Sequence, residues 1–248
     1  MIKICTVYFE GKYSPQYVNN LYNGLKNHST HDFEFICLSD NNSVYADKIY
    51  PLYNNLQIQK HWHKLKFFSE LFGQQSADDE IIIMDIDQII CNNIDDLLTF
   101  PVGKNELVTF APWWKQNTLK VHGGWYKFRS GQLNCIWNKF VQDPEKWQMY
   151  FYNKNIVNFK FYGEQNFVDL ACKQNDIKVT HMPGQWLGKY TLDPTSNRQL
   201  NMQYSEKFDL DYMILDEPHN DVKLVHFMNP NTDISNSKDA WVKELWKA

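Results

Sequence analysis

The chain has 248 residues, a net charge of -4 and 43% hydrophobic residues. This length fits one large α/β domain and is sufficient for a substantial core. Its only two arginines, Arg129 and Arg198, together with the net negative charge, argue against a nucleic-acid partner. The sequence contains no run of about 20 apolar residues, the length that a membrane span needs.

The cysteines indicate a reducing compartment. There are five, Cys5, Cys37, Cys91, Cys135 and Cys172, which are far apart, show no CxxC spacing and lie mostly in apolar runs. An odd count without a pairing pattern is typical of reduced core thiols. The first residues lead directly into a strand-like run without the features of a signal peptide. We therefore expect a cytoplasmic protein.

The first third of the sequence alternates between strand and helix patterns. The expected elements are strands over residues 2–9, 33–38 and 81–84, a helix that begins at Ser14-Pro15, and a helix over residues 62–72. Serine followed by proline is a common helix start, and the apolar residues after it recur at helical spacing. A βαβαβ run of this kind predicts a parallel sheet with right-handed crossovers.

The remaining elements predict a mixed sheet flanked by helices. We expect strands over residues 107–111, 123–128, 177–179 and 222–227, and helices that begin near residues 133 and 163. Residues 191–218 have weak periodicity and many polar side chains. A stretch of this length predicts an active-site loop or a helix that the pattern does not define.

Two carboxylates follow an apolar run. The run Ile81–Met84 does not alternate, which is typical of a parallel strand buried on both faces. Asp85 and Asp87 then lie one residue apart, so they leave the strand on the same side. At the carboxyl end of a parallel strand, such a pair suits magnesium or manganese bound to the phosphates of a substrate.

Two alternatives to this metal site remain. The aspartates could instead be structural and cap the turn at residues 92–97, although two like charges at a buried strand edge are costly without a cation. A phosphatase of the haloacid dehalogenase type also begins with strand, Asp, any residue, Asp. That motif expects Thr or Val where the sequence has Gln88-Ile89, and no later Gly-Asp motif is present.

An ordered set of motifs extends over nearly the whole chain. It comprises Thr6 and Tyr8, Leu38-Ser39-Asp40, His61-Trp62-His63-Lys64-Leu65, Asp85-Ile86-Asp87, Gly123-Gly124, Gly163-Glu164-Gln165 and His226-Phe227. In this order the motifs resemble those of GT-A-fold glycosyltransferases, similar to glycogenin-like family 8 enzymes and their small viral and bacterial relatives. The resemblance implies an α/β single-domain GT-A fold over residues 1–248, with a Rossmann-like βαβαβ nucleotide-binding half (1–100) and an acceptor-binding half (101–248).

The resemblance also implies a metal site. Asp87 would bind manganese directly, Asp85 would contact the ribose and the metal, and His226 would be the third protein ligand, with magnesium as the alternative ion. Neutral imidazole is a suitable ligand beside two carboxylates. Lys64 would contact the diphosphate. The alternatives are a core histidine at position 226 and a solvated lysine at position 64.

Further roles follow from the same resemblance. Thr6, Tyr8 and Asp40 would hold uracil and ribose, Gly123 and Gly124 would allow close approach of the sugar, and Glu164 and Gln165 would lie beneath the anomeric centre. Thr6 and Tyr8 could equally be ordinary strand residues, and Glu164 and Gln165 a polar pair at a helix start. His61 and His63 are interpreted as polar groups at a helix start.

The sequence departs from the family pattern after His226. Asn229-Pro230 stands where a glycine is expected, and Lys238 comes later than the phosphate-binding lysine of the family.

The function implied is manganese-dependent transfer of a hexose from a UDP-sugar to a hydroxyl acceptor such as a glycan. The resemblance favours retention, with catalytic roles for Asp87, Glu164 and Gln165, while an inverting route would use Glu164 as general base. We expect acceptor contacts from Trp113, Trp114, Trp125 and Trp186, each of which could instead fill the core. The alternative function is a non-catalytic protein that binds carbohydrate or nucleotide sugar.

Overall fold

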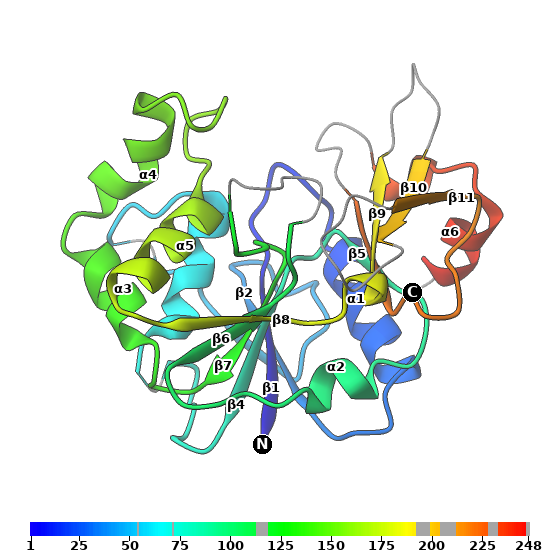
Figure 1. Ribbon diagram of the computed structural model, residues 1–248, viewed down its shortest axis with the longest axis horizontal. Coiled ribbons are helices and arrows are strands. Elements are labelled where there is room, and N and C mark those ends of the chain that lie inside the picture. Colours follow the sequence, from blue (N-terminus) through cyan, green and yellow to red (C-terminus); the bar gives the residue numbers. More distant parts are fainter. Residues whose placement is uncertain are drawn as a thin grey trace.

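A seven-stranded sheet forms the centre of the protein (Figure 1). The computed structural model describes residues 1–53, 55–70, 72–112, 119–191, 199–203, 212–227 and 233–246. The strands are β1 (Ile2–Val7), β2 (Glu34–Leu38), β3 (Lys48–Tyr50), β4 (Glu80–Met84), β6 (Glu106–Thr109), β7 (Trp125–Arg129) and β8 (Lys178–His181). Their order is β3-β2-β1-β4-β7-β6-β8. Strand β7 is antiparallel to both of its neighbours, and the other pairs are parallel.

A second sheet of five strands has the order β11-β10-β9-β12-β5. Its strands are β5 (Gln88–Ile90), β9 (Leu187–Thr191), β10 (Gln199–Gln203), β11 (Tyr212–Leu215) and β12 (Leu224–Phe227). Strand β12 lies between β9, to which it is parallel, and β5, to which it is antiparallel. The last described strand therefore returns to the segment that directly follows Asp87.

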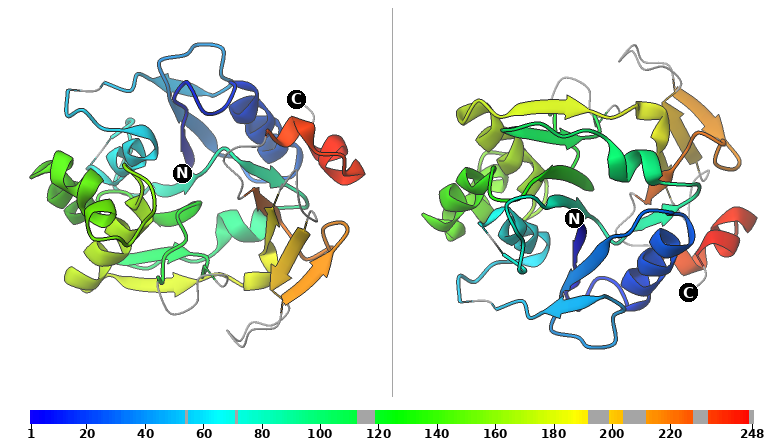
Figure 2. Two further views of the ribbon diagram at one scale, coloured as in Figure 1. Left: turned by 90° about the horizontal axis from the view of Figure 1, so that it is seen from above. Right: turned by 90° about the horizontal axis from the view of Figure 1, so that it is seen from below.

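Helices cover both faces of the central sheet (Figures 1 and 2). They are α1 (Gln16–Asn27), α2 (Asp95–Thr99), α3 (Asn134–Val141), α4 (Pro144–Asn153), α5 (Glu164–Gln174) and α6 (Ala240–Leu245), with the 3-10 helices η1 (Lys60–Phe68), η3 (Gly184–Trp186) and η4 (Ile234–Asn236). One apolar core lies against α1, α2 and α6, and the other against η1, α3 and α5.

Strand β4 contributes to both cores. Ile82 and Met84 pack in the first core, and Ile81 and Ile83 pack in the second. This confirms the prediction of a strand buried on both faces. Because both faces of β4 are covered, no residue of this strand lines the cleft, and Asp85, directly after the strand ends, is the next residue that does.

Several boundaries differ from the predictions. The helix expected over residues 62–72 is the 3-10 helix Lys60–Phe68, which ends earlier. The stretch 191–218 is not one loop, because β10 and β11 form an antiparallel pair within it. Residues 192–198 and 204–211 of this stretch lie outside the described residues. Helix α4 was missed, although Asp143-Pro144 is a start signal and the Asp143 side chain accepts from the Lys146 N–H.

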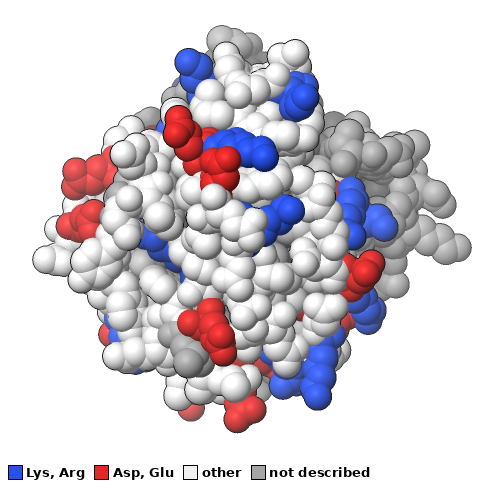
Figure 3. Space-filling model, turned by 90° about the vertical axis from the view of Figure 1, so that its left-hand side faces the viewer, with Lys and Arg blue, Asp and Glu red and all other residues white. Residues whose placement is uncertain are grey.

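The charged side chains and the cysteines are distributed as the low charge and the cysteine spacing of the sequence predict. On the face shown in Figure 3, basic and acidic side chains form small groups, some of them side by side, on a mostly uncharged surface. All five cysteines are free thiols, and all but Cys135 are buried. Among the described residues, no helix has the length and apolar character that crossing a bilayer requires.

Lys127 provides a test of the fold. Its side chain is fully buried in β7, where Nζ donates to the carbonyls of Leu98 and Phe100 at 2.6 Å each and pairs with Glu80 at 2.8 Å. The substitution Lys127→Met leaves these acceptors without their partner, and we expect a loss of about 3 kcal/mol in the free energy of unfolding, measured in urea. The control Lys104→Met, at an exposed position, should change it by less than about 0.5 kcal/mol. Equal effects of both substitutions would contradict this account.

Candidate functional site

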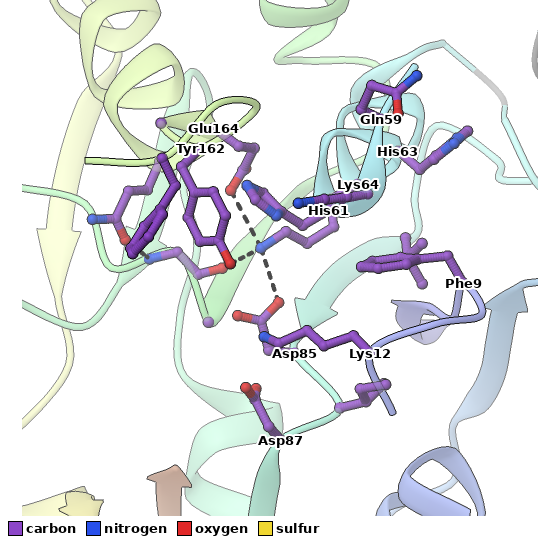
Figure 4. Close-up of a pocket in the computed structure, with 18 of the residues that line it drawn as sticks. Phe9, Lys12, Gln59, His61, His63, Lys64, Asp85, Asp87, Tyr162 and Glu164 are labelled. Atoms are coloured by element: carbon purple, nitrogen blue, oxygen red, sulfur yellow. Dashed lines mark hydrogen bonds and ion pairs between the residues drawn. The ribbon is translucent and has the colours of Figure 1, made fainter. Parts of the chain in front are cut away.

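An open cleft of about 1120 Å³ lies at the carboxyl ends of β1 and β4. Its walls come from residues 7, 9–13, 52, 58–61, 63–64, 85–87, 112, 122–124, 156–159, 162–166 and 226–227. Figure 4 shows Asp85 and Asp87 on one side, Glu164 and Tyr162 on another, and Lys64 between them. Segments from both halves of the sequence thus meet in one place.

Three possible metal ligands converge in this cleft. One ligand atom each from Asp85, Asp87 and His226 lies within 4.8 Å of the other two. The two aspartates follow β4, and His226 is on β12, where it stands opposite Gln88 of β5. The Phe227 N–H also donates to the Asp87 carbonyl at 3.0 Å. The pairing of β5 with β12 therefore brings the histidine to the carboxylates.

The donor set fits a hard divalent cation. Two carboxylates and one imidazole suit manganese or magnesium, with remaining positions left for phosphate or water. Tyr13 donates its hydroxyl to Asp87 Oδ2 at 2.7 Å, and its ring stacks on Tyr17 with 4.3 Å between the centroids. Burial and the neighbouring Asp87 raise the pKa of Tyr13 well above its usual value, so it stays a donor. Such a contact orients a ligating carboxylate.

A buried lysine lies behind the carboxylates. Lys64 is 3% exposed, and its Nζ is 2.7 Å from the Gly123 carbonyl, 2.9 Å from Asp85 Oδ1 and 3.3 Å from Glu164 Oε2. Burial alone would lower the pKa of Lys64, but Asp85 and Glu164 raise it above its ordinary value. The ammonium therefore remains charged and holds two acidic groups from distant parts of the sequence.

The two carboxyls respond differently to this environment. Burial tends to raise the pKa of Asp85, but the charge of Lys64 and its hydrogen bond bring it below its usual value. For Glu164, burial dominates and raises the pKa despite Lys64. Tyr126 donates to Glu164 Oε1 at 3.0 Å, so both oxygens of this carboxyl have partners.

The paired glycines are required by close packing. A Cβ on Gly124 would lie 2.7 Å from Gln88 Nε2 and 3.0 Å from His226 Nδ1. A Cβ on Gly123 would lie 2.8 Å from Gln165 Oε1, which accepts from the Gly123 N–H at 3.2 Å. Gln88 donates to the Gly124 carbonyl at 2.8 Å. Both glycines line the cleft, and their missing side chains also leave room for Gln165 and His226.

Two of the expected nucleotide contacts are not in the cleft, and these predictions were wrong. Thr6 is 0% exposed, and its hydroxyl donates to the Met84 carbonyl at 2.8 Å. Tyr8 is also buried and packs in the core with α1. Their strand neighbours Val7 and Phe9 line the cleft instead. Successive side chains along an extended chain point to opposite faces. The prediction named the residues that face the core, and their direct neighbours in the sequence face the cleft.

Asp40 and the two histidines of η1 lie in the cleft or beside it. Asp40 is exposed, and its Oδ1 accepts from the backbone N–H of the cleft residue Leu52 at 2.8 Å; its contact with a base stays a prediction. His61 and His63 both line the cleft. Burial lowers the pKa of His61 to about 3 and that of His63 to about 4, so both imidazoles are neutral near pH 7.

Of the four tryptophans expected at the acceptor, the two that the structure describes, Trp125 and Trp186, do not line the cleft. Trp113 and Trp114 lie outside the described residues. Trp125 is 0% exposed and packs in the core, so its assignment to acceptor contacts was wrong. Trp186 is half-buried, packs edge-on against Phe100 with 6.1 Å between the centroids, and does not line the cleft. Within the described part of the chain, the phenylalanine and tyrosine side chains that line the cleft are Phe9, Tyr13, Phe159, Tyr162 and Phe227.

Sequence reasoning missed several cleft residues. Lys12 and Tyr13 lie in the loop after β1, and the contact of Tyr13 with Asp87 spans 74 positions in the sequence. His122 directly precedes the two glycines, and its ring lies edge-on to that of His226 at 5.2 Å. The only available signal for His122 was its place beside Gly123-Gly124; Tyr13 had none.

Comparisons with known proteins identify the fold. No protein-family model matches the sequence, and no curated protein matches it. The structure of the galactosyltransferase LgtC in complex with donor and acceptor sugar analogues is similar, with a TM-score of 0.59 and 11% identity over 98% of this chain and 95% of LgtC. An active-site mutant of LgtC gives a TM-score of 0.57 at 12% identity over 98% and 94% of the two chains.

A third solved structure matches less completely. The apo form of the glycosyltransferase GlyE from Streptococcus pneumoniae TIGR4 has a TM-score of 0.50 at 12% identity, over 75% of this chain and 46% of GlyE. The match to LgtC extends over nearly all of both chains. The protein therefore has the GT-A glycosyltransferase fold that the order of its motifs predicts.

Proposed function

We propose that the protein is a manganese-dependent glycosyltransferase that moves a hexose from a UDP-sugar to a hydroxyl of a glycan, with retention of configuration. The observation that carries this proposal is the convergence of Asp85, Asp87 and His226 in an open cleft at the carboxyl ends of the sheet. The fold is shared with LgtC, whose structure contains donor and acceptor sugar analogues. We further propose that residues 1–100 bind the nucleotide and residues 101–248 the acceptor.

The metal ligands and two lysines would act on the diphosphate. Asp85, Asp87 and His226 would hold the cation, which when bound neutralises charge on the leaving diphosphate. Lys64 contributes positive potential from behind the carboxylates, although its Nζ already has three partners. Lys12 is exposed and lines the cleft, so its ammonium is the better placed of the two to contact a phosphate directly.

The surroundings of Glu164 support retention. A general base for an inverting route would need a carboxylate oxygen within reach of the acceptor hydroxyl. Glu164 is 2% exposed, and its oxygens face Tyr126 and Lys64. We therefore assign it, with Gln165, to the wall beneath the sugar. The bond from the anomeric carbon to the diphosphate breaks, the bond to the acceptor oxygen forms on the same face, and the acceptor proton passes to the leaving diphosphate.

Removing one carboxylate charge tests the proposed metal site. With UDP-glucose or UDP-galactose as donor, wild type should release UDP only when manganese is present. Asp87→Asn should reduce this release by more than about 100-fold, because a ligating oxygen and a charge are lost together. The control Asp96→Asn, at an exposed aspartate paired with Lys223, should behave as wild type. Full activity of Asp87→Asn would exclude this ligand set. Tight binding of the donors by wild type without UDP release would identify a binding protein.

The hydrogen bond from Tyr13 predicts a change in metal affinity. Tyr13→Phe keeps the stacked ring but removes the donor to Asp87, so manganese should bind about tenfold more weakly, as measured by calorimetry in the presence of UDP. Tyr22→Phe is a matched control, because Tyr22 donates to Asp47 at 3.0 Å on the surface away from the cleft. If both variants bind manganese as wild type does, Tyr13 does not orient this ligand.

The anomeric configuration of the product tests the proposed retention. Proton NMR of the product should show the new glycosidic bond in the same anomeric configuration as the donor. The opposite configuration would return Glu164 to the role of general base and would refute retention.

A further inference from the structure

The segment between α4 and α5, residues 154–163, forms one lip of the cleft and exposes two apolar side chains. Ile156 is 55% exposed and Phe159 is 63% exposed, and both line the cleft. Exposed apolar side chains at the rim of a cleft are available to contact a ligand that enters it.

The backbone of the lip is strained and held in place. Phe161 has a φ of +63°, which is uncommon for a bulky residue, and Asn155 has a φ of +55°. The Trp62 indole N–H, from the core, donates to the Phe161 carbonyl at 2.9 Å, and the Ile156 N–H donates to the Phe151 carbonyl at 2.9 Å. Strained backbone that its surroundings hold in place is concentrated at ligand sites. The backbone of the lip therefore has a defined conformation, which these hydrogen bonds hold in place.

An aromatic surface leads from the lip to the proposed reaction centre. The rings of Phe159 and Tyr162 lie 5.5 Å apart, and the His61 ring lies edge-on to Tyr162 at 5.2 Å. Tyr162 is two residues before Glu164, and Figure 4 shows both on the same side of the cleft. Phe159 therefore continues the aromatic wall of the cleft beyond Tyr162 with a side chain that is open to solvent.

We propose that Phe159 and Ile156 form an outer acceptor subsite, which binds a pyranose ring of an oligosaccharide acceptor one or more units away from the reacting hydroxyl. This inference rests on the proposed function. An exposed aromatic face is complementary to the C–H face of a sugar ring. A second copy of the chain is a poorer occupant, because stable interfaces bury about 800 Å² per partner and two side chains supply much less.

The experiment compares donor hydrolysis with transfer to acceptors of different length. UDP-glucose and UDP-galactose are supplied with manganese, first alone and then with glucose or maltotriose, and with galactose or lactose. Phe159→Ala should lower the ratio of transfer to hydrolysis about three- to tenfold for the oligosaccharides, through a higher KM, and should leave that ratio unchanged for the monosaccharides. Phe159→Trp should restore transfer, because it restores an aromatic face.

Tyr45→Ala is the matched control, since Tyr45 is 53% exposed and does not line the cleft; all its rates should equal those of wild type. If wild type releases no UDP from either donor, the proposed function fails, and this inference fails with it. If UDP is released normally but Phe159→Ala transfers to every acceptor as wild type does, only the acceptor subsite is refuted. Phe159→Ala could also change the sedimentation coefficient, which reports self-association, or the binding to phosphatidylglycerol vesicles. Either change without a change in transfer would likewise refute the acceptor subsite.

Discussion

The pairing of β12 with the short strand β5 is the contact on which the site depends. Strand β5 follows the two aspartates directly, and β12 lies more than a hundred residues later in the sequence. Their antiparallel register sets His226 opposite Gln88, and a backbone hydrogen bond of 3.0 Å joins Phe227 to Asp87. Without this pairing the carboxylates would be a pair of like charges at a strand end, which is costly when partly buried. With it they become part of a group of three side chains whose ligand atoms are close enough to share one metal ion.

Lys64 compensates the repulsion between acidic side chains in the cleft. Asp85 and Glu164 are acidic groups of the same cleft, and their repulsion would oppose folding if nothing compensated it. A buried ammonium between them, anchored on the Gly123 carbonyl, keeps both in place before any ligand arrives. Removal of such a cation would leave uncompensated buried charge, which is strongly destabilising. These side chains are therefore held in place without any ligand, which would reduce the cost of binding one.

Local patterns predicted the parts of this arrangement that depend on neighbouring residues. The non-alternating run before Asp85 identified β4, and the spacing of Asp85 and Asp87 placed both carboxylates on one side. The face of β1 was predicted wrongly at Thr6, since an apolar strand buried on both faces carries no alternation that would distinguish them. Tyr13 could not be found, because its contact depends on how the loop after β1 folds over a residue 74 positions away. His226 was proposed only from motif order, since no local pattern marks a histidine for a distant strand pair.

We propose that one divalent cation binds between Asp85, Asp87 and His226. Crystals grown with manganese and UDP, measured at the manganese absorption edge, test it directly. The account predicts a single strong anomalous peak within bonding distance of Asp85, Asp87 and His226, next to the two phosphates. A peak elsewhere, or bound UDP with no peak at these three side chains, would contradict it.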